Sequence, residues 1–69
     1  MEDNNKQRLI QALETERANL LKHDMDVTEH DITIAFLKTG AVPPYVNISE
    51  YSLLEACIED LDTIISDYV

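Results

Sequence analysis

The stretch "SEYSLLEACIEDLDTIISDY", Ser49 to Tyr68, decides the fold of this chain. Its apolar residues recur at alternating spacings of 4 and 3, which is the pattern of an amphipathic helix with a narrow apolar seam. The seam consists of Leu54, Ile58, Leu61, Ile65 and Tyr68. Ser49 suits the N-cap position. The sequence therefore predicts a helix over residues 49–68, and the seam must be covered by other parts of the chain or by a partner.

Two more helices are predicted on the N-terminal side of this stretch. Residues 4–23 carry an apolar stripe of leucines, and residues 28–39 end just before Gly40, the residue best suited to a left-handed C-cap. The middle segment is ambiguous, because the run from Ile32 to Leu37 also shows the alternation of a strand. A short β-hairpin is therefore the alternative for this segment. We expect an all-α protein, a small bundle of these three helices in a single acidic domain of residues 1–69.

The segment "KTGAVPPYVNIS", Lys38 to Ser49, separates the second and third predicted helices and holds the only glycine and both prolines. The residue before a proline is restricted to extended geometry, so a helix cannot pass through this segment. Its apolar side chains predict a loop that folds back over the edge of the core. These side chains are Val42, Tyr45, Val46 and Ile48. We interpret the segment mainly as a hinge.

Length and cysteine content limit how the chain can be stabilised. A domain of 69 residues buries a small core, and a single cysteine excludes an internal disulfide. Self-association is therefore the expected additional source of stability, and the third predicted helix is the expected surface for a homodimer. No apolar run reaches the length of a membrane span, and the acidic N-terminus does not resemble a signal peptide. We therefore expect a cytoplasmic protein.

Charge is the most unusual property of the sequence. The net charge is −9, from 14 acidic and 5 basic residues, and Lys38 is the last basic residue. A field of this sign repels nucleic acid and anionic membranes and favours basic protein surfaces. On the third predicted helix the acids form a strip with no nearby cation, although like charges at this spacing destabilise a helix. The candidate partner-binding residues are Glu55, Glu59, Asp60, Asp62 and Asp67.

A solvated polar face explains the same acids equally well. If the carboxylates crowd together in the folded state, their pKa values are raised, and stability should increase as pH falls from 7. This expectation needs no partner to be tested.

Signals for chemistry are weak. The run "HDMDVTEHD", His23 to Asp31, holds two histidines and four carboxylates, and Asp26 and His30 could share a divalent ion on one side of a helix. The spacing of a known metal motif is missing, so a metal-dependent regulator is the lowest-ranked function. Cys57 lies between apolar residues and carboxylates, which raise a thiol's pKa and suppress its reactivity. We expect no enzyme activity and no cofactor.

Two functional hypotheses remain. In the first, the chain is a non-catalytic inhibitor whose carboxylates occupy the basic surface of a nucleic-acid-binding protein, in place of phosphates. Its small size and acidity are typical of nucleic-acid mimics from phages and mobile elements, which is an analogy of charge and size. In the second, the chain is a homodimeric structural or assembly subunit that uses the apolar side of the third helix.

Overall fold

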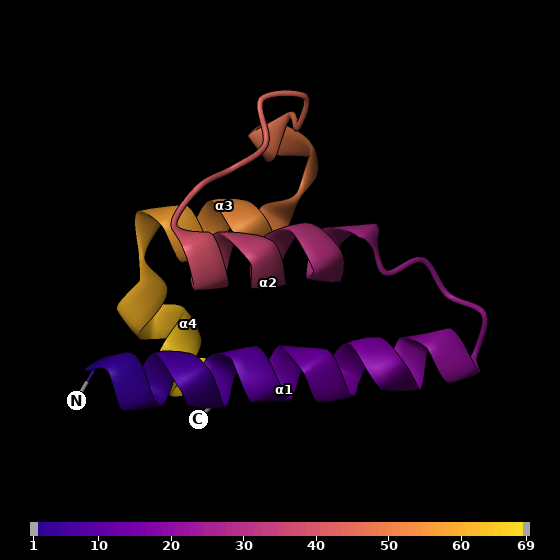
Figure 1. Cartoon of the computed structure of the whole chain (residues 1–69), viewed down its shortest axis with the longest axis horizontal. Helices are drawn as coiled ribbons and strands as arrows, with labels where there is room; N and C mark the ends of the chain where they lie inside the picture. The colour runs from indigo at the N-terminus through magenta and orange to yellow at the C-terminus, as the bar shows by residue number, and fades with distance from the viewer. Residues whose placement is uncertain (1, 69) are drawn as a thin grey trace.

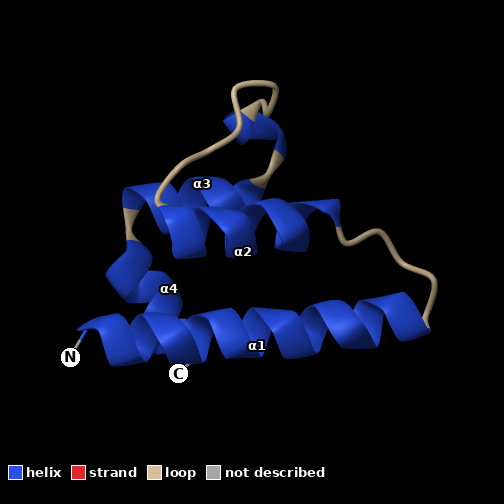
Figure 2. Cartoon of the chain, in the orientation of Figure 1, coloured by secondary structure: helices blue, strands red, loops and turns tan. Residues whose placement is uncertain are grey.

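The computed structural model describes residues 2–68, with side chains from residue 4 onward. These residues form four α-helices and one turn of 3₁₀ helix (Figure 1). The elements in chain order are α1 (Glu2–Lys22), α2 (Thr28–Thr39), η1 (Ile48–Glu50), α3 (Ser52–Glu59) and α4 (Leu61–Tyr68). No strand occurs within residues 2–68 (Figure 2), so the all-α class is confirmed and the β-hairpin considered for the middle segment is not observed.

The helices pack in a closed order in which each contacts the next and the last returns to the first. α1 packs against α2, α2 against α3, α3 against α4, and α4 against α1. α1 and α2 run alongside each other, and α4 turns from the end of α3 back towards α1 (Figure 1). This arrangement encloses one small core between the four helices.

Local chemistry explains both ends of α2. Before the helix, the Asp26 carboxylate accepts hydrogen bonds from the Thr28 backbone N–H at 2.9 Å and from the Thr28 hydroxyl at 2.6 Å. After the helix, Gly40 takes a left-handed φ of 78° and donates its N–H to the Phe36 carbonyl at 2.7 Å. A side chain with a Cβ adopts this φ only at a cost, which is why glycine ends the helix. The predicted bounds of this helix are confirmed.

The single helix predicted over residues 49–68 is wrong, because the chain is interrupted at Tyr51 and at Asp60. The Asp60 carboxylate accepts hydrogen bonds from the Thr63 N–H at 3.3 Å and the Thr63 hydroxyl at 2.7 Å, so Asp60 caps the start of α4. Its backbone, at φ −151° and ψ 75°, is not helical. The break redirects the chain, so that α3 packs on α2 and α4 packs on α1. Four helices therefore replace the expected three.

The core is small and is built mainly from the first three helices. Its buried side chains are Leu9, Ile10 and Leu13 of α1, Thr33, Ile34 and Leu37 of α2, and Leu54 and Cys57 of α3. None of the described side chains of α4 is fully buried, although Leu61, Ile64 and Ile65 pack against the core from the side.

The predicted seam is consequently not buried along its whole length. Leu54 lies in the core and Leu61 and Ile65 are half-buried, whereas Ile58 is 40% exposed and Tyr68 is 38% exposed.

The loop between α2 and η1 partly follows the expectation. Val42, Val46 and Ile48 are half-buried, as a loop folded over the core edge requires. Tyr45 contradicts the expectation, because its side chain is 83% exposed. Within the described residues, none of the helices combines the length and the apolar character needed to cross a membrane.

Candidate protein-binding surface

The five acids predicted to bind a partner are spread along α3, the junction at Asp60, and α4. Glu59 is the last residue of α3, Asp60 is the junction itself, and Asp62 lies in the first turn of α4; we call these three residues the acidic corner. Glu55, which is half-buried, flanks the corner on α3, and the exposed Asp67 flanks it on α4. Because the chain turns at Asp60 (Figure 1), these acids belong to two helices on either side of a bend and do not form a strip along one helix.

Asp60 has a structural role within this corner. Hydrogen bonds from the Thr63 hydroxyl and the Thr63 N–H stabilise its ionised form and lower the pKa of its carboxyl group. Both of its oxygens accept these bonds. Asp60 therefore contributes negative charge to the corner, while the side chains of Glu59 and Asp62 are exposed.

Ion pairs of the described residues are confined to the contact between α1 and α2. The pairs are Arg17 Nε with Asp31 Oδ1 at 2.5 Å, Lys38 Nζ with Glu14 Oε2 at 3.3 Å, and, when the imidazole is protonated, His30 Nε2 with Glu16 Oε1 at 2.6 Å. Residues later in α1 pair with residues earlier in α2, as antiparallel helices require. Among residues 4–68 no acid beyond Asp31 takes part in an ion pair, so the acids of the corner are not neutralised in this way.

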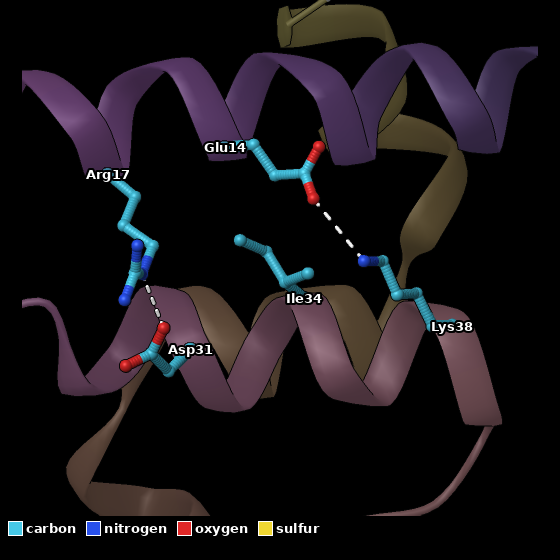
Figure 3. A pocket seen from close by; sticks show the side chains of 5 residues that line it. All are labelled: Glu14, Arg17, Asp31, Ile34 and Lys38. Carbon is cyan, nitrogen blue, oxygen red and sulfur yellow. Dashed lines mark hydrogen bonds and ion pairs between the residues drawn. The ribbon is translucent and has the colours of Figure 1, made fainter.

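A hollow of about 340 Å³ lies between α1 and α2 (Figure 3). Ile34 lies between two of the ion pairs in this hollow, with Arg17 and Asp31 on one side and Glu14 and Lys38 on the other. Each cation faces an anion of the opposite helix. The lining charges are therefore balanced, and the hollow holds none of the acids predicted to bind a partner.

The two weak metal candidates have separate partners. The hydrogen bonds from Thr28 lower the pKa of Asp26, and His30 contacts Glu16. Over the described part of the chain, no group of three or more histidine, cysteine or carboxylate side chains is arranged to hold a metal ion. Cys57 is buried, and burial, together with the negative charge of Glu29, raises the pKa of its thiol. This thiol is not activated for nucleophilic attack.

Sequence reasoning missed the role of Glu29. Its carboxylate reaches from α2 to the start of α3, where it accepts hydrogen bonds from the backbone N–H groups of Leu53 at 2.6 Å and Leu54 at 3.4 Å. In the sequence, Glu29 is only one of the four carboxylates in the run from His23 to Asp31. No local spacing reveals a contact between residues 24 positions apart.

Sequence reasoning also missed the exposure of Tyr45, because an aromatic residue between half-buried neighbours suggests burial.

In comparisons with known proteins, the chain matches no family model, no curated protein and no solved structure.

Proposed function

We propose that this protein is a non-catalytic acidic binding module that docks the acidic corner, with Glu55 and Asp67, on the basic surface of a nucleic-acid-binding protein. One observation carries the proposal: the acids of α3 and α4 have no ion-pair partner among the described residues, while all three ion pairs join α1 to α2. A cationic groove on another protein would supply the missing counter-charges.

The spacing of the carboxylates supports the same function. Side chains one helical turn apart, such as Glu55 and Glu59, are separated by about 5–6 Å at their Cβ atoms. This separation is of the same order as that between neighbouring phosphates, so two carboxylates can contact two basic side chains that otherwise bind nucleic acid. Such an inhibitor would associate quickly, and its affinity would fall as salt screens the charges.

The test compares two variants with equal net charge. Glu55→Gln, Glu59→Gln and Asp62→Asn together remove three charges near the corner, and Gln7→Lys, Gln11→Lys and Asn19→Lys together add three cations at exposed positions of α1. Both variants change the net charge from −9 to −6. Proteins retained by the immobilised chain are purified, and dissociation constants are measured at about 50 and 200 mM NaCl.

We expect the corner variant to lose at least about tenfold in affinity and much of its salt dependence, because paired charges at an interface are lost. The α1 variant should retain most of the affinity. Equal losses in both variants would mean that only the net charge matters and would contradict a docking face at the corner. An unchanged affinity in the corner variant would contradict the proposal directly.

A homodimeric subunit is the second candidate, favoured by the partial exposure of Ile58 on α3 and Tyr68 on α4, the two helices found where one helix was expected to form the dimer surface. A dimer would bring together two chains of charge −9, which opposes association. Light scattering of the free chain at micromolar concentration separates the two candidates. A monomeric mass would contradict the homodimer.

A further inference from the structure

Tyr45 is the most exposed large apolar side chain in the described structure, at 83%, compared with 38% for Tyr68. Its hydroxyl forms no hydrogen bond with any described residue. A side chain in this position buries little surface and therefore contributes little to the stability of the fold. Small or polar residues are usual in turns, and the turn that carries Tyr45 does not require an aromatic ring.

The turn itself is well fixed. The Val46 N–H donates a hydrogen bond to the Pro43 carbonyl at 3.1 Å, which closes a four-residue turn with Tyr45 as its third residue. Pro43 and Pro44 each have a restricted φ, which reduces the number of conformations open to the loop. Pro43 and Val46 are half-buried on either side of the exposed tyrosine.

Both flanks of the turn are also tied to the helices. On the N-terminal side, the Ala41 N–H donates to the Thr39 hydroxyl at 3.2 Å. On the C-terminal side, the Asn47 carboxamide oxygen accepts from the Ser49 N–H at 3.3 Å and from the Ser49 hydroxyl at 2.8 Å. The loop projects beyond the helices (Figure 1). Tyr45 thus lies in a turn closed by a backbone hydrogen bond, and its side chain is exposed to solvent.

We propose that Tyr45 is the anchor residue through which this protein holds its protein partner: the ring enters an apolar-walled slot on the partner, and the hydroxyl forms a hydrogen bond at the end of that slot. The inference rests on the proposed function for the basic character of the partner. Tyrosine is enriched among the few residues that dominate interface energy. A rigid aromatic side chain loses little conformational freedom on binding, and the fixed turn reduces this cost further.

Tyr45 and the acids would then have different effects on binding. Charges mainly accelerate association and make it salt-dependent, whereas a buried aromatic anchor mainly slows dissociation. Loss of the anchor should therefore shorten the lifetime of the complex without changing its salt dependence. Loss of the acids should change the salt dependence.

The experiment uses Tyr45→Ala, Tyr45→Phe and a control, Met25→Ala, which shortens an apolar side chain that is 55% exposed in the loop between α1 and α2. The probe is the protein retained from a cell lysate by the immobilised wild-type chain, purified before use. Rates of association and dissociation are measured at about 50 and 200 mM NaCl. Thermal unfolding of the free variants shows that each remains folded.

We expect Tyr45→Ala to weaken binding by about tenfold or more through faster dissociation. Tyr45→Phe should lose less affinity than Tyr45→Ala, and this smaller loss measures the contribution of the hydroxyl. Met25→Ala should bind like the wild type. The anchor role of Tyr45 would be contradicted if Tyr45→Ala bound with the affinity of the wild type. It would also be contradicted if Met25→Ala lost as much affinity as Tyr45→Ala.

These outcomes separate the anchor from the proposed function. If only the corner variant weakens binding, the result supports the proposed function and contradicts the anchor role of Tyr45. If binding needs Tyr45 but does not change with salt or in the corner variant, the result supports the anchor role of Tyr45 and contradicts docking through the acidic corner. A wild-type chain that retains no protein at about 50 mM NaCl overturns both.

Discussion

At the scale of single residues, Thr33 is an unusual member of the core. Its side chain is fully buried on α2, and its hydroxyl has no hydrogen-bond partner. Thr39 on the same helix shows the common solution, because its hydroxyl donates to the Ala35 carbonyl at 2.8 Å. A buried hydroxyl without a partner costs about 1–3 kcal/mol.

We therefore expect Thr33→Val, which replaces the hydroxyl with a methyl group, to increase the free energy of unfolding by about 1 kcal/mol. In a domain of this size such a change raises Tm by about 4–8 °C. Urea and thermal unfolding followed by far-ultraviolet circular dichroism measure it. Thr33→Ser, which keeps the hydroxyl and removes the methyl group, should be less stable than wild type. A Thr33→Val variant less stable than wild type would show that the native hydroxyl is hydrogen-bonded.

At the scale of elements, α3 depends on a side chain from another helix. The Glu29 carboxylate caps its first turn through the Leu53 and Leu54 N–H groups, and an isolated helix of eight residues is not stable in water. We expect Glu29→Ala to lower the free energy of unfolding by about 1–2 kcal/mol. Glu29→Gln should cost less, because its carboxamide oxygen can still accept the hydrogen bonds.

Urea unfolding measures these changes, and hydrogen exchange locates them in α3. The amides of Leu53 and Leu54 should exchange faster in Glu29→Ala than in wild type. Glu50→Ala is the control, because Glu50 is exposed one turn before α3 and its carboxylate accepts no hydrogen bond from a described residue. Unchanged exchange of both amides in Glu29→Ala would contradict the capping role.

The elements also show which parts of the fold the sequence could predict. The C-terminal bound of α2 follows from Gly40, a local signal that acts within a few residues of the chain and was sufficient. The interruption at Asp60 was also present locally, as an aspartate before an apolar residue with a threonine three positions later. The regular seam favoured one helix. In the structure the break at Asp60 allows α3 to pack on α2 and α4 to pack on α1.

At the scale of the whole molecule, charge is divided between two regions. Ion pairs fasten α1 to α2, while the acids of α3 and α4 lie on either side of a bend and have no ion-pair partner in the described structure. Because no base follows Lys38, the sequence indicated that these acids have no cation near them along the chain. It could not predict their arrangement around the bend, and it could not predict Tyr45, because both depend on how the chain turns in space.

The dependence of stability on pH tests this division of charge. The sequence suggested that crowding raises carboxylate pKa values, but hydrogen bonds from Thr28 and Thr63 lower the pKa values of Asp26 and Asp60 below their ordinary 3.8. A group whose pKa is lower in the folded state stabilises the fold above its unfolded pKa, and this stabilisation is lost as pH falls through the folded pKa. We therefore expect stability to fall below about pH 4, where protonation weakens the hydrogen bonds that both carboxylates accept.

Thermal unfolding of wild type, Asp26→Asn and Asp60→Asn between pH 2 and 7 measures this effect. Each variant should be less stable than wild type at pH 7, and its stability should fall less steeply below pH 4, because one titrating carboxylate is already absent. Added salt should stabilise all three at pH 7, because it screens the repulsion of a chain with net charge −9. A stability that instead rose steadily down to pH 2 would contradict this expectation. It would mean that relief of charge repulsion stabilises the fold by more than protonation of Asp26 and Asp60 destabilises it.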